Sequence, residues 1–146
     1  MRLAAMAIVT MLGASAASAH DMSDAGVPGR AGDVTRTIKV IADDTSFDVK
    51  SIAVKPGETV RFIVTNNGKI DHEFSIATHA EHLAHRQMMQ EMPDMKHNDP
   101  NMVTLKPGQT KHLIWKFTRA ANDIEFACDI PGHAEAGMAG SFVVAP

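Results

Sequence analysis

The chain has 146 residues, 45% of them hydrophobic, which is enough for one domain with its own core. Its formal net charge is −3, and the sequence has no basic patch with interleaved aromatic residues, which argues against a nucleic-acid-binding protein. A single cysteine excludes a disulfide within the chain. These properties favour a small acidic protein whose one thiol has a role other than an intramolecular disulfide.

Residues 1–19 have the features of a secretory signal peptide. Arg2 supplies a positive charge, residues 3–14 are apolar, and the Ala-Ser-Ala of residues 17–19 forms a small-residue cleavage site. The apolar run is too short for a membrane span, and a single arginine argues against twin-arginine export. We expect a mature protein that begins at His20, without a membrane anchor, in the periplasm. A lone thiol in that oxidising compartment is best explained by metal coordination.

The rest of the chain has the pattern of an all-β protein. Residues 20–33, rich in Gly, Ala and Asp, predict a flexible lead-in. Alternating apolar residues and Pro-Gly or Asn-Gly turns then predict about eight short strands. We therefore predict a Greek-key β-sandwich for residues 34–146. The strand segments are residues 34–42, 47–54, 59–65, 72–77, 113–117, 124–128 and 141–144.

An insertion at residues 79–102 interrupts this pattern. Thr78 and Glu81 have the spacing of a capping box and Pro93 would stop a helix, which predicts a helix of about fourteen residues. The insertion has one Leu and no Ile, Val or Phe, so it is poorly supplied for a core. It is rich instead in imidazole and thioether side chains, namely His79, His82, His85, Met88, Met89, Met92, Met95, His97 and Met102.

Two interpretations of the helix remain open. At about 100° per residue, one face carries His82, His85, Met89 and Met92. This face can pack on the sandwich, with methionines filling gaps, or it can bind additional copper, because imidazole and thioether groups are soft ligands.

A second set of soft ligands lies near the C-terminus. Cys128, His133 and Met138 follow one another at intervals of five residues, with Pro131-Gly132 as a turn between them. Another imidazole, His72, precedes them. Each residue alone is more often structural, but two His, one Cys and one Met together form the ligand set of a mononuclear blue-copper site.

Other candidates are weaker. His112 has the outward parity of its strand and is expected on the surface. After cleavage of the signal peptide, His20 would offer an amine and an imidazole to copper. A disordered terminus is the simpler interpretation. Asp71 and Glu73 flank His72 and either orient nearby groups or face water.

The chain resembles the cupredoxins, the plastocyanin and azurin superfamily, over most of residues 34–146. The similarity rests on the Val-Lys-Pro-Gly-Glu-Thr-Val-Arg-Phe of residues 54–62, the His-Glu-Phe of residues 72–74, and the spacing from Cys128 to Gly140. It implies one type 1 copper held by His72, Cys128, His133 and Met138. The His/Met-rich insertion is most similar to that of periplasmic copper-tolerance cupredoxins of the CopI type.

Three classes of function compete. An enzyme such as a multicopper oxidase is not expected, because Cys128 is flanked by Ala127 and Asp129 rather than by a histidine that would lead to a second copper centre. A copper-binding protein that cycles Cu(I)/Cu(II) in support of copper tolerance is favoured by the insertion. A one-electron carrier is the alternative. Expected partners are a redox protein (a cytochrome or copper oxidase) or the copper-export machinery, and a monomer is expected.

Overall fold

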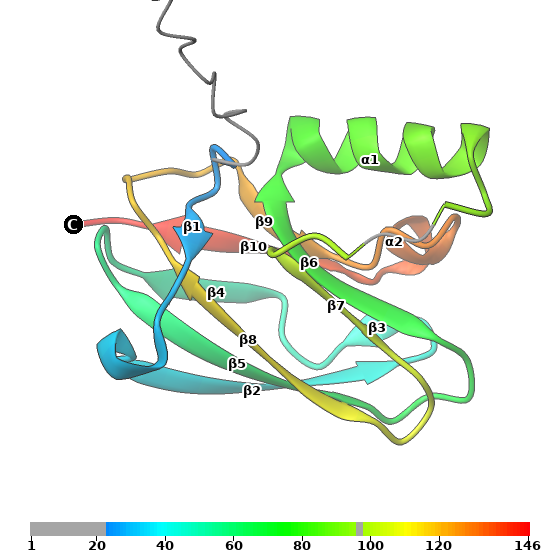
Figure 1. Ribbon diagram of the computed structural model, residues 1–146, viewed down its shortest axis with the longest axis horizontal. Coiled ribbons are helices and arrows are strands. Elements are labelled where there is room, and N and C mark those ends of the chain that lie inside the picture. The colour runs from blue at the N-terminus through cyan, green and yellow to red at the C-terminus, as the bar shows by residue number, and fades with distance from the viewer. Residues whose placement is uncertain (1–22, 96–97) are drawn as a thin grey trace, which may run out of the picture.

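The computed structural model describes residues 23–95 and 98–146. The predicted signal peptide, His20 and His97 lie outside the described residues. Within these ranges, ten strands form two five-stranded sheets that pack face to face (Figure 1). The predicted all-β sandwich with a helical insertion is confirmed, and the number of strands is slightly larger than expected.

The first sheet has the strand order β1-β8-β5-β2-β3 and the second has the order β4-β10-β9-β6-β7. Most neighbours are antiparallel, but β2 pairs with β5, and β4 with β10, in parallel. The strands of the first sheet are β1 (Val27–Pro28), β2 (Arg36–Asp43), β3 (Ser46–Phe47), β5 (Thr59–Asn66) and β8 (Thr110–Lys116). Those of the second are β4 (Ser51–Val54), β6 (His72–Thr78), β7 (Met102–Leu105), β9 (Ile124–Ala127) and β10 (Ala139–Val144).

The core lies between the two sheets and is built around aromatic rings. Successive strand residues point to opposite faces, so the alternating apolar residues of each strand meet in one layer. Phe74 is in contact with both Phe47 and Phe126, with ring centroids 5.6 Å apart in each pair. Such ring pairs add to the free energy of burial. These contacts join the two sheets through apolar side chains.

One predicted strand is divided in the structure. Residues 47–54 were expected to form a single strand, but Phe47 ends β3 in the first sheet and Ser51 begins β4 in the second. Between them, the Asp48 carboxylate accepts a hydrogen bond from Ile41 N–H at 2.8 Å, and Asp48 N–H donates to Ile41 O at 3.0 Å. These bonds hold the chain where it crosses from one sheet to the other.

The described part of the predicted lead-in differs from a flexible segment. Ala25 is fully buried, and β1 pairs with β8. The indole Nε1–H of Trp115 donates to Ala25 O at 3.2 Å. A buried indole needs an acceptor, and the backbone of this segment provides one. A short 3₁₀ helix, Ala31–Asp33, then leads into β2.

The helical insertion lies on the outer side of the second sheet (Figure 1). Helix α1 (His79–Glu91) begins at the capping box formed by Thr78 and Glu81, as predicted, and ends before Pro93. The first sheet covers one face of β6, and α1 packs against the opposite face of this strand. All residues of β6 are therefore buried. The outer face of this strand is thus an interior environment, although its side chains are partly polar.

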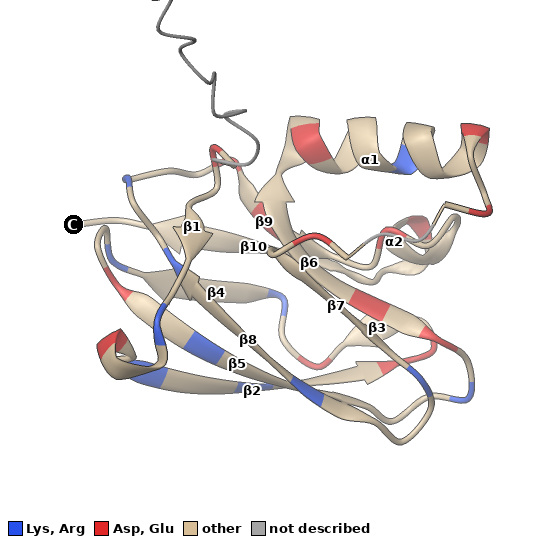
Figure 2. Cartoon of the chain, in the orientation of Figure 1, with Lys and Arg blue, Asp and Glu red and all other residues tan. Residues whose placement is uncertain are grey.

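Basic and acidic residues lie on different parts of the molecule. Basic residues lie along the strands β2, β5 and β8 of the first sheet, whereas acidic residues dominate the helices and their connecting segments (Figure 2). Within the described part of the chain, no helix is long and apolar enough to cross a membrane.

Candidate metal centre

Two neighbouring strands bring the first two predicted ligands to one end of the second sheet. His72 begins β6, and Cys128 follows directly after β9. The two strands are antiparallel, with Ser75 opposite Ala127, so the start of one lies beside the end of the other. Both His72 and Cys128 are fully buried.

The loop after Cys128 supplies the other two predicted ligands. Gly132 has φ +86°, a left-handed conformation that glycine adopts easily, and it caps the short helix α2 (His133–Ala136). Met138 N–H donates to His133 O at 3.1 Å, and Cys128 N–H donates to Met138 O at 3.0 Å. The predicted Pro-Gly turn thus closes into a compact loop.

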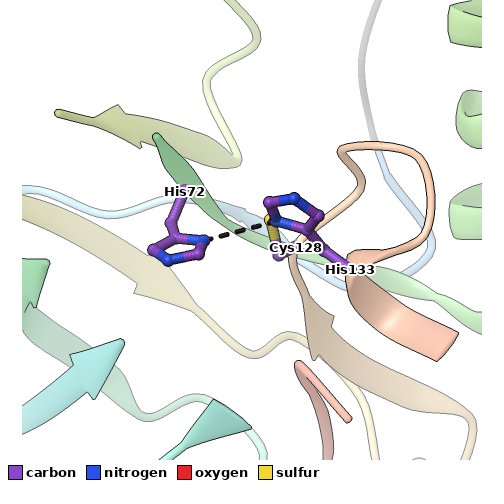
Figure 3. A group of neighbouring side chains, drawn as sticks. All are labelled: His72, Cys128 and His133. Atoms are coloured by element: carbon purple, nitrogen blue, oxygen red, sulfur yellow. Dashed lines mark hydrogen bonds between the residues drawn. The ribbon is translucent and has the colours of Figure 1, made fainter. Parts of the chain in front are cut away.

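The donor atoms of three predicted ligands lie close together (Figure 3). Nδ1 of His72 is 3.3 Å from Nδ1 of His133, which is itself 3.3 Å from Sγ of Cys128. All three ligand atoms lie within 4.8 Å of one another. Such separations suit ligands of one ion, because metal bonds to nitrogen and sulfur are about 2.0–2.3 Å long. The donor set of two imidazoles and a thiol fits copper.

Met138 is fully buried in the hydrophobic core. Its backbone bonds to Cys128 and His133 place it on the same loop as these ligands. Because the residue is fully buried, its thioether is shielded from solvent.

Burial changes the ionisation of two predicted ligands when no metal is bound. It raises the pKa of the Cys128 thiol to about 12, since a thiolate is poorly solvated there. Burial, together with the neighbouring His72, lowers the pKa of His133. The imidazole is therefore neutral and available as a ligand near neutral pH, whereas a metal must displace the thiol proton to bind sulfur.

Glu73 adjoins the site through its backbone. Its N–H points at Sγ of Cys128, 3.3 Å away, in a position to stabilise a thiolate. The residue is 6% exposed, and burial, together with the charge of Asp129, raises the pKa of its carboxyl to about 7. Of the two acidic residues that flank His72, Glu73 is thus buried beside the site and Asp71 is exposed.

Asp44 belongs to the site and was not expected from the sequence. Its Oδ1 lies 3.2 Å from Nε2 of His72, on the side of the ring opposite to Nδ1. A carboxylate on the second ring nitrogen is a common partner of a metal-binding histidine. Asp44 lies between the predicted strands 34–42 and 47–54, and no local pattern indicates its role because the contact joins parts of the chain 28 residues apart.

The predicted face of α1 is divided between two environments. His82 is buried, with Nδ1 2.9 Å from Oδ2 of Asp129, so this imidazole packs on the sandwich. His85 and Met89 are half-buried, and Met92, which caps the helix, is exposed. His112 is exposed, as predicted.

Comparisons with known proteins agree with this geometry. The sequence of residues 34–145 matches the family model of the copper-binding proteins of the plastocyanin/azurin family. The chain belongs to this family. Its cupredoxin sandwich is similar to auracyanin from Roseiflexus castenholzii (TM-score 0.64, 21% identity, 77% of this chain and 99% of that one). It is also similar to auracyanin B (TM-score 0.66, 20% identity, 85% and 96%).

More similar sequences place the chain among cupredoxins of the CopI type. The copper-resistant cuproprotein CopI of Rubrivivax gelatinosus is 48% identical over 130 residues, which cover 88% of this chain and 78% of the relative. CopI of Vibrio cholerae is 47% identical over 119 residues (80% and 70%). CopI of Pseudomonas aeruginosa is 38% identical over 162 residues (91% and 88%).

Proposed function

We propose that this cupredoxin is a periplasmic protein that binds one copper ion in a type 1 site and cycles it between Cu(I) and Cu(II) in support of copper tolerance. The observation that carries the proposal is the convergence of His72 and His133, 61 positions apart, with the buried thiol of Cys128. The relatives named as copper-resistant cuproproteins support the tolerance role. Met138 is proposed as the axial ligand.

The mixed donor set suits both oxidation states. Copper supplies one-electron redox chemistry when it is bound. The Cys128 sulfur favours Cu(I), while imidazole ligands suit Cu(II) as well. The donors project from the start of β6 and from a loop closed by backbone hydrogen bonds. Little rearrangement is therefore needed between the two states.

The proposal predicts a defect in cells. In a strain that lacks the gene, the wild-type protein should restore growth on elevated copper, and Cys128→Ser should not, because the sulfur ligand is lost. His112→Gln, which changes an exposed imidazole on β8, serves as the control and should restore growth. Full restoration of growth by an equally abundant Cys128→Ser protein would contradict the proposal.

A one-electron carrier is the second candidate function. His133 is half-buried whereas His72 is fully buried, so His133 is the imidazole that reaches the surface. Its neighbours Ala134 and Ala136 on α2 are small and leave the ring edge accessible. A cytochrome or copper oxidase partner can approach an electron donor at this position.

Copper binding by helix α1 would distinguish the two candidate functions. His82 is directed at Asp129, and the other soft side chains of the predicted face are His85, Met89 and Met92. A tolerance protein that uses them should bind more than one Cu(I) per chain. Replacing His85 with Gln and both methionines with Leu should reduce binding to one Cu(I) per chain and lower copper tolerance. The visible spectrum should stay intact. One Cu(I) in both proteins, with unchanged tolerance, would favour the carrier.

A further inference from the structure

Helix α1 is attached to the sandwich by a buried polar pair. His82 is the one buried residue of this helix. Its Nδ1 lies 3.0 and 2.9 Å from Oδ1 and Oδ2 of Asp129, and its side chain is 0% exposed against 2% for Asp129. A buried carboxylate is costly without donors, so this contact fixes both the helix and the aspartate.

Asp129 receives donors from two further residues. Ser75 Oγ, on β6, donates to Asp129 Oδ2 at 2.6 Å, and Arg86 Nη1, one turn after His82 on α1, approaches Oδ1 at 3.4 Å. The carboxylate is therefore held by contacts from both β6 and α1.

Asp129 is covalently joined to the sulfur ligand. Cys128 lies in the hydrophobic core, whereas the side chain of the next residue meets α1. Ser75 Oγ also lies 3.0 Å from Ala127 O, on the other side of Cys128. The residues on both sides of Cys128 are thus held by side chains of β6 and α1.

We propose that His82 is a positioning residue of the copper centre, through which helix α1 holds Asp129 and the attached Cys128 in place. The proposal rests on the proposed function, since it assigns His82 to the same site. In this proposal α1 supports the type 1 copper site, whereas auxiliary copper binding would use α1 as a separate site. His82 acts through Asp129 and does not itself touch copper.

The test uses His82→Leu, which removes the donor, and His82→Asn, whose amide nitrogen can replace Nδ1. His112→Leu makes the same change at an exposed imidazole and is the control. In the copper-loaded protein, His82→Leu should shift the midpoint potential and the intensity ratio of the visible bands. It should also release copper to a chelator about tenfold faster, as is typical for lost outer-shell contacts. His82→Asn should restore most of each property, and His112→Leu should resemble the wild type.

A readout without copper separates this proposal from the proposed function. In the metal-free protein, His82→Leu should displace the amide NMR signals of residues 128–133, while His112→Leu leaves them in place. If the wild type bound no copper at Cys128, the proposed function would fail and this NMR comparison would still test the coupling. A folded His82→Leu with wild-type spectrum, potential and loop signals would overturn the positioning role.

Ser75→Ala keeps the test decisive if His82→Leu does not fold. This variant removes a different donor from Asp129 and leaves the helix pair intact. It should alter the band ratio in the loaded protein and shift the loop signals in the metal-free protein. Wild-type values for both in a folded Ser75→Ala protein would overturn the proposal.

Discussion

The imidazole of His72 lies between the imidazole of His133 and the carboxylate of Asp44. Its Nε2 is 3.2 Å from Oδ1 of Asp44, and its Nδ1 faces His133. Asp44 Oδ1 also accepts from Lys69 N–H at 2.7 Å, and this bond, with the His72 contact, holds the Asp44 pKa below its usual value despite partial desolvation. A Cβ at Gly68 would collide with Asp44 Oδ1 and approach His72 Nε2, so only glycine permits this close contact.

Replacing Asp44 with Asn should raise the reduction potential. A carboxylate on the far ring nitrogen makes the imidazole more basic and so favours Cu(II) over Cu(I). A tenfold selective loss of Cu(II) affinity corresponds to a rise of about 59 mV for one electron. Voltammetry of Asp44→Asn and of the control Asp43→Asn, whose carboxylate meets Asn67 instead, measures the difference. Equal midpoints in both variants and the wild type would rule out tuning by Asp44.

Replacing Met138 with Leu should leave copper bound but raise its midpoint potential. Leucine fills nearly the same buried volume without a sulfur donor, and losing the axial thioether disfavours Cu(II) more than Cu(I). Voltammetry and the visible spectrum report the change. The buried Met102 of β7 offers a matched Met→Leu control outside the loop. An unchanged midpoint with an unchanged spectrum would mean that Met138 is not the axial ligand.

Glu81 should contribute stability that depends on pH. Burial opposes its ionisation, but hydrogen bonds from Thr78, Ser23 and the backbone of Asp24 outweigh this and lower its pKa. A lowered folded-state pKa means that its stabilisation is complete above the unfolded pKa, about 4.3, and is lost as pH falls through the folded pKa.

Glu81→Ala should therefore cost about 1 kcal/mol of unfolding free energy at pH 7, and less at pH 3. Glu81→Gln keeps an acceptor for the capping box and should lose less at pH 7, with little dependence on pH. Denaturant titrations monitored by fluorescence measure both. A loss for Glu81→Ala that is the same at both pH values would contradict the assignment.

The copper-free domain should remain folded. The core of packed aromatic and aliphatic residues between the sheets supplies the driving force without an ion. Trp115 is the single tryptophan and is 1% exposed, so its emission should stay blue-shifted after copper is removed with a chelator. Circular dichroism should retain the sheet signal. Red-shifted emission and loss of that signal under native conditions would show that folding requires metal.

The sequence contained the parts of this structure that depend on local patterns. Alternation predicted the strands, Thr78 and Glu81 predicted the start of α1, and the Cys-to-Met spacing placed three candidate ligands on one loop. The assignment of these residues as copper ligands stays a prediction. Strand β7 was missed because it is short and begins at the last residue of the predicted insertion.

Contacts between distant segments could not be predicted in the same way. The pairing of Asp44 with His72 and of His82 with Asp129 joins residues 28 and 47 positions apart. Helical periodicity predicted that His82, His85, Met89 and Met92 share one face, but it does not state what packs against that face. Only the fold reveals that Asp129 lies beneath the helix.

A copper titration of the wild type and of Cys128→Ser tests the central claim most directly. The wild type should develop intense visible absorption that saturates at one equivalent of Cu(II), because that band arises from a thiolate-to-copper transition. Cys128→Ser should remain folded, since serine is a close substitute in size, and should show no such band. Metal analysis after desalting gives the stoichiometry. A folded Cys128→Ser protein that keeps the band at wild-type strength would contradict the account.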